Sequence, residues 1–512
     1  MAFEVRYTDL AARIGRLSTP HGEVETPAFV PVVHPVRQTI SPKFLKEKMG
    51  FSLVITNAYI TLKHYGDEAR KRGIHDIIGF DGSVMTDSGG YQVLEYGSVE
   101  VEPTAMAQFE KDIKSDIPIP LDKPTGYGLP YGQAKEYVRI TLENCKETLS
   151  VVGDDTDAVW VGPVQGAEHF DLVEHSAKAL DEMGFQFMAL GSPVELMEAY
   201  EFATLTRMIA RAKKVIPAKP VHLFGAGHPL TIPLAISLGC DTFDSASYML
   251  YAKDGRYMHA NGTARMEEMT YLPCQCPVCS SYTLAELRGM PRDQRTIELA
   301  KHNLHVLKAE VDATKQAIMD GRLWEYVMQK ARAHPKLMEA ARLLGDDELD
   351  FVADGTPLFK EKAIFFFDPI DQHRPEAKRF RLAVSQFSTT TRKKKKLVIF
   401  PEGEVHPFYA TRGFKALAKK FPDAQLATYN PYLGIIPAEI SDVFPASHNL
   451  TARTERRISD YASFVESLQA FAAKFDEVVI VAADEFMKQA VQQARLKARV
   501  EDYHSEHVID RL

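Results

Sequence analysis

The sequence has little cysteine, no long hydrophobic run and no strong excess of charge, and each shortage excludes a class of protein. Five cysteines in 512 residues are too few for a disulfide-dense secreted scaffold. No uninterrupted apolar run is long enough to cross a bilayer. The first twenty residues lack the apolar segment of a secretion signal. We therefore expect a protein of the reducing cytoplasm that has no membrane partner.

The balance of charge is mildly acidic, with a formal net charge of −8. This balance is unfavourable for a nucleic-acid binder, but phosphate binding depends on local patches more than on the total. The strongest basic patch is "TRKKKKLVIF" at 391–400. It is interpreted either as a phosphate-binding patch or as a solvated linker.

Length and composition are those of a globular enzyme with more than one domain. Hydrophobic residues make up 45% and charged residues 25% of the chain, which is ordinary for a soluble enzyme, and 512 residues exceed one hydrophobic core. The acidic stretch 345–357 ends in Gly and Pro and is predicted to be a linker. The predicted domains are a catalytic domain at 1–345 and two smaller α/β or α+β domains at 346–430 and 431–512.

Short β-branched runs alternate with helix-length segments before the linker, a pattern typical of a parallel α/β fold. Amphipathic periodicity predicts helices at 170–183, 201–216 and 320–344. Eight parallel strands with helices between them favour a closed (β/α)₈ TIM barrel, and a doubly wound open sheet is the alternative. The eight predicted strands cover 25–33, 51–57, 82–87, 117–122, 157–165, 185–191, 220–227 and 240–246.

Polar residues and glycines gather where these predicted strands end. In a barrel the carboxyl ends of the strands face one opening, where the chemistry takes place. A polar residue at one strand end marks only an exit into a loop, but several acidic and amide side chains together indicate a site. The strands end in Asn57, Asp87, Asp122, Gln165, Gly191, Gly227 and Asp244.

Three cysteines crowd into "YLPCQCPVCS", where Cys274, Cys276 and Cys279 form a C-x-C-x-x-C spacing. A helical stretch downstream supplies His302 and His305, one turn apart on the same face. Three thiolates and one imidazole complete a tetrahedral zinc set with no open position. The pattern predicts one structural Zn²⁺ per chain, in a subdomain at about 270–310, and leaves the choice of histidine open.

Two acidic strand ends suit displacement at an anomeric carbon, in which one carboxylate attacks and the other moves a proton. Asp87 is one of them, and the double glycine after it lets the backbone approach a ligand closely. Tyr91 follows and offers a ring that can stack on a base. The other is Asp241 or Asp244, which point to opposite faces of a strand, so only one can face the site.

These motifs closely resemble those of the tRNA-guanine transglycosylases. The resemblance covers about residues 1–345 and rests on "TDSGGYQV", "VQG", "HLFGAGHP", "FDSAS", "LPCQCPVC" and "HNL", in that order along the chain. "LDKPT", "HLFGAGHP" and the C-terminal extension resemble the archaeal branch. That branch exchanges guanine at position 15 of the tRNA D-arm for 7-cyano-7-deazaguanine (preQ0), in archaeosine biosynthesis.

The resemblance implies a role for each matching residue. Asp244 is the expected nucleophile toward the ribose C1′, and Asp87 is the expected general acid and base. Cys274, Cys276, Cys279 and His302 are the expected zinc ligands, so the resemblance selects His302 over His305. The residues expected to bind the base are Tyr91 by stacking and Asp122, Gln165 and the backbone of Gly191 by reading its edge.

The resemblance also implies partners, and it has two departures. The expected partners are tRNA, guanine, preQ0 and a second copy of the chain in a homodimer. The family's double glycine after the sixth strand is here Gly191–Ser192. No C-terminal PUA domain is recognised, so we expect a form that lost this module or receives it from a separate polypeptide.

Three alternative functions remain at this stage. A non-catalytic tRNA-binding homologue is disfavoured because both Asp87 and Asp244 are present. The archaeosine synthase paralogue needs a reactive lysine motif that is not found in the C-terminal region. A metal-dependent hydrolase needs an open metal position at the strand ends. Asp241 is interpreted as a cap or turn residue and His222 as a structural histidine.

Overall fold

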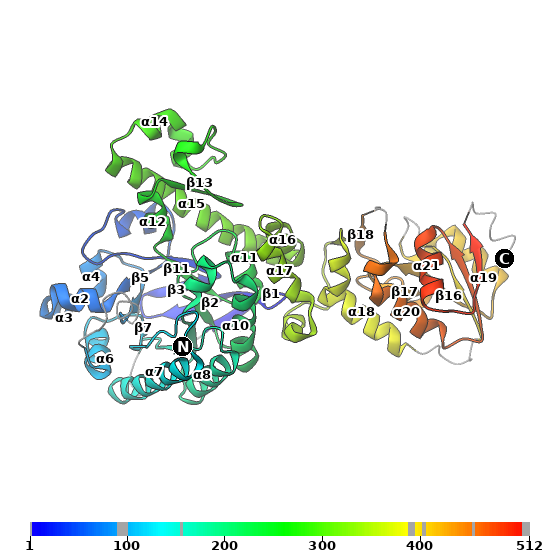
Figure 1. The fold of residues 1–512 in the computed structure, drawn as a ribbon, viewed down its shortest axis with the longest axis horizontal. Helices are drawn as coiled ribbons and strands as arrows, with labels where there is room; N and C mark the ends of the chain where they lie inside the picture. Colours follow the sequence, from blue (N-terminus) through cyan, green and yellow to red (C-terminus); the bar gives the residue numbers. More distant parts are fainter. Residues whose placement is uncertain are drawn as a thin grey trace. The chain divides into compact units, whose positions relative to one another are not determined.

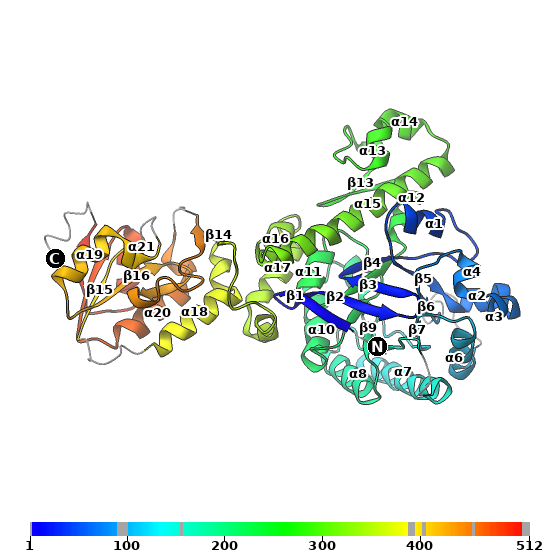
Figure 2. The ribbon, with the colours of Figure 1, turned by 180° about the vertical axis from the view of Figure 1, so that it is seen from behind.

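The chain divides into two compact units, at Met1–Leu343 and Leu344–Leu512 (Figures 1 and 2). The structure is a computed structural model. No helix within its described residues combines the length and apolarity needed to span a bilayer. The structure describes residues 3–89, 101–153, 157–387, 395–401, 406–452 and 456–503.

Each of the eight predicted strand segments contains a strand of the first unit. The runs are short and almost entirely buried, as expected of strands covered on both faces. The strands are β4 (Ala28–Pro31), β5 (Leu53–Asn57), β6 (Ser83–Asp87), β7 (Ile117–Ile119), β8 (Val161–Val164), β9 (Phe187–Leu190), β10 (Val221–Leu223) and β11 (Thr242–Ser245).

These strands pair in parallel, in a five-stranded sheet of order β4-β11-β10-β9-β8 and a three-stranded sheet of order β5-β6-β7. Val32, just after β4, forms a parallel bridge with Ile55 of β5. The N–H of Val159, just before β8, donates to the carbonyl oxygen of Asp116, just before β7 (2.8 Å). Parallel pairing places the carboxyl ends of neighbouring strands at the same edge.

Helices connect the strands, as crossover connections between parallel strands require. The predicted helices at 170–183 and 201–216 correspond to α8 and α10. The connecting helices are α1 (Pro42–Glu47), α2 (Ala58–Tyr65), α3 (Asp67–Arg72), α4 (Ile74–Ile78), α6 (Pro103–Asp112), α7 (Tyr131–Val152), α8 (Phe170–Glu182), α9 (Pro193–Glu198), α10 (Phe202–Val215) and α11 (Ile232–Ser237).

An antiparallel sheet of β1 (Phe3–Asp9), β2 (Ala12–Thr19) and β3 (Gly22–Thr26) precedes the parallel strands. Arg13 of β2 reaches Asp241, with its Nη2 2.6 Å from Oδ2. Both side chains are buried, and Asp241 also accepts the N–H of Val221 (2.8 Å). The interpretation of Asp241 as a cap or turn residue was therefore wrong, because its ion-pair partner lies 228 residues away.

A helical excursion follows β11 and contains the cysteine cluster. In Figures 1 and 2 its α14 and β13 project beside the long helix α15. The elements are α12 (Ser247–Lys253), β12 (Arg256–His259), β13 (Gly262–Arg265), η1 (Met266–Glu268), α13 (Pro277–Ser281), α14 (Leu284–Gly289) and α15 (Arg292–Met319).

The predicted single helix at 320–344 is two helices, α16 (Leu323–Ala331) and α17 (Pro335–Arg342). Pro335 has no N–H to donate and disfavours helical geometry at the residue before it. His334 accordingly has an extended backbone and caps α17 by accepting the N–H of Lys336 (3.2 Å). The prediction was wrong because an amphipathic pattern continued across the proline.

The second unit is built on one five-stranded sheet of order β17-β16-β15-β19-β20. Its strands come from both sides of residue 430, so 346–430 and 431–512 share a sheet and a core instead of forming two domains. The predicted linker contains η3, which buries Leu349 and Val352. The elements are η2 (Leu343–Gly345), η3 (Asp347–Ala353), β14 (Ile364–Phe366), η4 (Pro369–His373), α18 (Pro375–Gln386), β15 (Lys396–Ile399), η5 (Phe408–Ala410), α19 (Arg412–Lys420), β16 (Gln425–Asn430), β17 (Gly434–Pro437), η6 (Ala438–Ile440), β18 (Asn449–Thr451), η7 (Ile458–Asp460), α20 (Ala462–Ala472), β19 (Glu477–Ala482), α21 (Glu485–Gln493) and β20 (Arg499–Asp502).

Candidate active site and metal centre

Asp87 is the last residue of β6 and lies beside Asn57, the last residue of β5. Asn57 Nδ2 donates to Asp87 Oδ2 (3.2 Å), and the N–H of Gly89 donates to Asp87 Oδ1 (3.3 Å). Gly89 has a φ of +98°, which glycine adopts without strain. The turn after β6 therefore folds back onto the carboxylate that precedes it.

The pKa of Asp87 is raised to about 6, chiefly by burial and then by the negative charge of Asp244. The hydrogen bonds from Gly89 and Asn57 act in the opposite direction without cancelling the rise. A carboxyl group with this pKa exchanges its proton near neutral pH, as a general acid and base must.

Asp244 lies in β11, and one of its carboxylate oxygens is held by two donors. Oδ1 accepts the N–H of Gly225 (2.8 Å) and lies 3.1 Å from Nε2 of His222. The hydrogen bonds within the described residues leave Oδ2 of Asp244 without a partner. The carboxylate is thus fixed through one oxygen, and the other oxygen is available to react.

Asp122 and Gln165 follow β7 and β8 and contact each other. Gln165 Nε2 donates to Asp122 Oδ2 (2.6 Å). Burial, and then the charge of Asp87, raises the pKa of Asp122 to about 7. The pKa of Asp87 responds to the charge of Asp244, and the pKa of Asp122 responds to the charge of Asp87, so Asp87 lies within electrostatic range of both other carboxyl groups. The structure therefore brings these predicted site residues together.

The amide of Gln165 is locked in one orientation by Thr125, which the sequence did not single out, and by Ser192. Its Oε1 accepts the backbone N–H of Thr125 (3.0 Å), the hydroxyl of Thr125 (3.1 Å) and the hydroxyl of Ser192 (3.2 Å). Ser192 also accepts the N–H of Gly126 (3.0 Å). The serine that replaces the family's second glycine is therefore part of the site.

Gly191 packs directly against Gln165, and a Cβ at this position would lie 2.2 Å from Nε2 of Gln165. Only glycine allows this approach. The N–H of Gly191 already donates to the carbonyl oxygen of Val164 (2.9 Å). Tyr91, the predicted stacking residue, lies outside the described residues.

His222 was interpreted from the sequence as structural, yet it contacts the predicted nucleophile. It is fully buried, and its Nδ1 lies 2.8 Å from the hydroxyl of Thr242 while its Nε2 faces Asp244. No sequence signal could identify this contact, because the two residues lie on neighbouring strands, β10 and β11.

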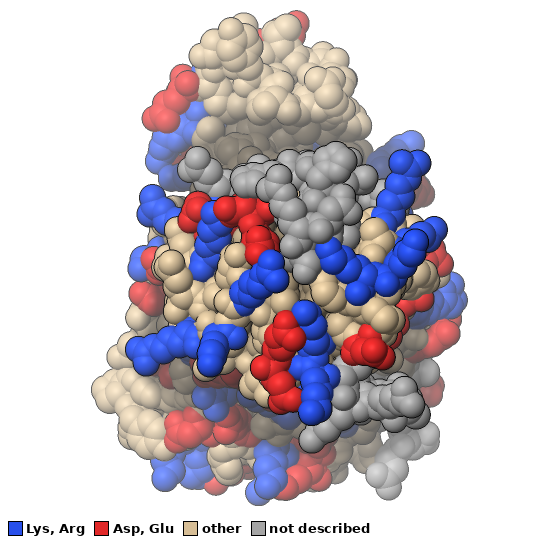
Figure 3. All heavy atoms as spheres, turned by 90° about the vertical axis from the view of Figure 1, so that its right-hand side faces the viewer, with Lys and Arg blue, Asp and Glu red and all other residues tan. Residues whose placement is uncertain are grey.

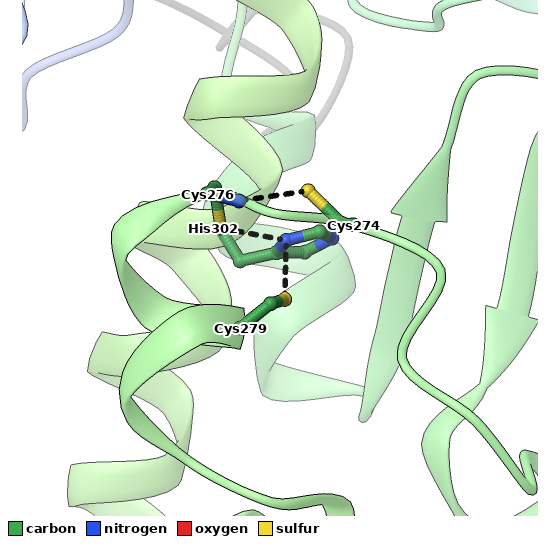
Figure 4. A group of neighbouring side chains, drawn as sticks. All are labelled: Cys274, Cys276, Cys279 and His302. Atoms are coloured by element: carbon green, nitrogen blue, oxygen red, sulfur yellow. Dashed lines mark hydrogen bonds between the residues drawn. The ribbon is translucent and has the colours of Figure 1, made fainter.

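The predicted metal ligands converge (Figure 4). One ligand atom from each of Cys274, Cys276, Cys279 and His302 lies within 4.8 Å of all the others. Nδ1 of His302 lies 3.4 Å from the sulfurs of both Cys276 and Cys279. His305 is not part of this group.

Contacts around His302 prepare it to bind a metal. Its Nε2 lies 2.8 Å from the carbonyl oxygen of Met258, to which it donates, so the lone pair of Nδ1 points toward the sulfurs. The ring stacks on Tyr257 with centroids 3.8 Å apart. A partner on the second nitrogen fixes the tautomer and orientation of a ligating histidine. Three thiolates and an imidazole suit zinc in a closed site.

A second group of potential ligands, His21, His75 and Asp116, has no recognisable spacing in the sequence. His21 Nδ1 lies 2.6 Å from Asp116 Oδ1, and His75 Nε2 lies 2.8 Å from Asp116 Oδ2. These are lengths of direct hydrogen bonds. We interpret the group as a clamp that ties the β2–β3 turn and α4 to the start of β7.

The basic stretch at 391–400 is described only from Lys395 onward. Lys396 pairs with Glu477 (2.7 Å), and elsewhere on this unit Lys488 pairs with Asp502 (2.6 Å). Figure 3 shows Lys and Arg interspersed with Asp and Glu on one face. The described residues on this face therefore carry charges of both signs. Residues 391–394 of the predicted basic patch lie outside the described residues.

Comparison with known proteins places the chain among tRNA-modifying enzymes. The family described as queuine tRNA-ribosyltransferase matches residues 9–336. Three similar proteins are each named tRNA-guanine(15) transglycosylase. The Aeropyrum pernix protein is 50% identical over 335 residues, which are 65% of each chain. The Methanosarcina barkeri protein is 38% identical over 511 residues (97% of each chain), and the Sulfolobus acidocaldarius protein is 38% identical over 448 residues (86% of this chain and 87% of that one).

Proposed function

The chain belongs to the queuine tRNA-ribosyltransferase family, and on that premise we propose that it exchanges guanine at position 15 of tRNA for preQ0. It is a tRNA-guanine transglycosylase, an enzyme of the glycosyltransferase type. The names of its relatives support the position in tRNA. The D-arm location, the choice of preQ0 and the place in archaeosine biosynthesis rest on the archaeal motifs of the sequence.

The first half of the exchange transfers the ribose to the enzyme. Oδ2 of Asp244 attacks C1′ of the ribose, the C1′–N9 bond breaks, and its electron pair goes to the departing guanine. Protonated Asp87 donates a proton to that base. The product is a covalent ester between Asp244 and the ribose, as in retaining glycoside hydrolysis.

The second half reverses these roles. Ionised Asp87 takes the N9 proton of preQ0, N9 bonds to C1′, and the ester bond breaks to return Asp244 as a carboxylate. The observation that carries this assignment is the environment of the two carboxyl groups. Asp244 is held through Oδ1 by contacts with Gly225 and His222, which leaves Oδ2 open, while the pKa of Asp87 is raised to about 6.

Base recognition is assigned to Asp122, Gln165 and Gly191, with Tyr91 stacking on the ring. An ionised Asp122 accepts the N–H groups of a guanine-like edge. The locked amide of Gln165 offers its second N–H as a donor toward a base carbonyl. The N–H of Gly191 is already engaged with Val164. Gly191 therefore contributes to base binding by letting the base approach the backbone closely, or by accepting a hydrogen bond with its own carbonyl oxygen.

The scaffold is proposed to be a closed (β/α)₈ barrel. In support, both gaps between the two sheets carry a backbone link, Val32 to Ile55 on one side and Val159 to Asp116 on the other. Closure gathers the carboxyl ends of all eight strands at one rim. That rim carries Asp87 and Asp244.

Zinc is the proposed occupant of the Cys274, Cys276, Cys279 and His302 group, one ion per chain. The bound ion supplies a cross-link that joins the segment around α13 to α15. The four protein ligands fill a tetrahedral ion, so the site is structural and forms the centre of a zinc subdomain at about 270–310. By family resemblance we further propose a homodimer that acts on tRNA in the cytoplasm.

Incorporation of labelled guanine into unmodified archaeal tRNA tests the proposed function. The wild type should incorporate the label, and preQ0 should compete with it. Asp244→Ala should abolish incorporation, whereas Asp81→Ala should not, because Asp81 is exposed and pairs with Lys46 on the surface. A wild type without incorporation would support a non-catalytic homologue, and full activity in Asp244→Ala would refute the assigned nucleophile.

A further inference from the structure

We infer that His222 is the positioning residue that holds Asp244 in its attacking orientation, an inference that rests on the proposed base exchange. Its evidence is a chain of three side chains, Thr242, His222 and Asp244, on the two neighbouring strands β10 and β11. None of these contacts was assigned from the sequence.

The imidazole of His222 is fixed at both nitrogens. The hydroxyl of Thr242 lies 2.8 Å from Nδ1, and the carboxylate of Asp244 lies 3.1 Å from Nε2. An ionised carboxylate can only accept, so Nε2 carries the proton that is shared with it. Nδ1 of the neutral ring then accepts the hydroxyl proton of Thr242. Asp244 thereby dictates the tautomer.

The ring cannot easily take another position. His222 is fully buried, and the ring of Phe224 packs edge-on against it with centroids 4.8 Å apart. Buried side chains in contact on several sides keep one rotamer. The donor aimed at Asp244 is therefore in place before substrate binds, as effective electrostatic stabilisation requires.

The two hydrogen-bond donors that contact Asp244 give its two carboxylate oxygens different roles. Gly225 and His222 both donate to Oδ1, which leaves Oδ2 to attack C1′. In the covalent ester Oδ1 becomes the carbonyl oxygen, and it remains hydrogen-bonded. When preQ0 displaces the ester, negative charge returns to this carboxylate, and the N–H of His222 stabilises it as it forms.

The test compares two amides that reproduce different nitrogens of the ring. His222→Gln places its amide nitrogen where Nε2 lies, and it can still donate to Asp244. His222→Asn reaches only as far as Nδ1, so it can still pair with Thr242 but loses the contact with Asp244. Both changes remove the imidazole, and a purely packing role would therefore affect the two variants alike.

We expect kcat for guanine exchange to fall about 10- to 100-fold in His222→Asn, because a hydrogen bond to a charged group is lost. His222→Gln should recover most of that loss. KM for tRNA should stay within about threefold of the wild type in both, since His222 does not touch the bulk of the tRNA. The covalent enzyme–tRNA adduct, trapped on denaturing gels, should form more slowly in His222→Asn.

Thr242→Val is a second test of the positioning role and leaves His222 itself unchanged. Valine keeps the β-branched shape but cannot donate to Nδ1, so the ring loses its anchor and kcat should fall less than in His222→Asn. Equal kcat values for the Asn and Gln variants, or a change confined to KM, would overturn the positioning role. If the wild type itself shows no exchange, the proposed function fails instead, so the two failures are distinguishable.

Discussion

Gly191→Ala should weaken base recognition about 100-fold while leaving the fold intact. A Cβ at this position would lie 2.2 Å from Nε2, 2.7 Å from Cδ and 2.8 Å from Oε1 of Gln165. Real Cβ atoms do not approach other atoms so closely, so Gln165 must move. The obstacle is the end of a flexible side chain rather than backbone, and the surrounding strands can therefore stay where they are.

The cost is the loss of the hydrogen bonds that orient the amide of Gln165. The bond to Asp122 (2.6 Å) is charge-assisted when Asp122 is ionised, and such a bond contributes about 1.5–3 kcal/mol. The contacts of Oε1 with Thr125 and Ser192 add about 1 kcal/mol each where they are lost. Loss of the bond to Asp122 together with one of these contacts totals about 3 kcal/mol, which corresponds to about a 100-fold fall in kcat/KM for preQ0.

Steady-state exchange kinetics at saturating tRNA, with preQ0 varied, measure this effect. A matched control is Gly132→Ala, because Gly132 lies in α7 with nothing within 4 Å of an added Cβ, and its kinetics should be unchanged. Gly191→Ala combined with Gln165→Ala should be little worse than Gln165→Ala alone, since both remove the same group. Additive losses, or normal preQ0 kinetics in Gly191→Ala, would refute the reasoning.

Two further predictions concern the metal centre and the buried carboxyl group. His302→Ala should lower the zinc content, measured by mass spectrometry of metals, well below one ion per chain. His305→Ala, one turn along α15, should keep the zinc content of the wild type. A chelator that stops turnover at once while the fold stays intact would contradict a structural ion. Asp122→Asn should stabilise the protein by about 1–3 kcal/mol at pH 8 and not at pH 4 in urea unfolding. The pKa of Asp122 is raised to about 7, so the folded state binds its proton more tightly than the unfolded state does. Stability of the wild type is therefore lost as pH rises from about 4 to 7. If Asp122→Asn is not more stable than the wild type at pH 8, Asp122 ionises in the folded protein without a free-energy penalty.

Local sequence was sufficient for the strands and for the metal ligands. Each of the eight predicted segments contains a strand, because a short apolar run bounded by turn residues suits a strand that is buried on both faces. The three cysteines span only six residues, so short-range geometry alone brings them together. At Pro335 the proline itself is the local signal for a helix boundary. The amphipathic pattern continues on both sides of it and led to the prediction of a single helix.

The predicted boundary at residue 430 in the second unit shows a different limit of prediction from sequence. Strands β16 and β17 pair across residue 430. Strand β15 lies between β16 and β19, although β19 begins at Glu477, 78 residues after the end of β15 at Ile399. Sheet order depends on long-range pairing, which a single sequence does not record. A change in composition along the chain was therefore no guide to the boundaries of a core.

The sequence by itself determined which side chains stand at the strand ends and which family they resemble, since both follow from residue order. Only the tertiary structure decided how those side chains act on one another. The donor from His222 to Asp244, the lock that Thr125 and Ser192 place on Gln165, and the raised pKa values of Asp87 and Asp122 all arise between different strands or loops. Their cause is burial among neighbours that are distant in sequence, which fixes hydrogen-bond partners and removes the water that would otherwise screen each charge.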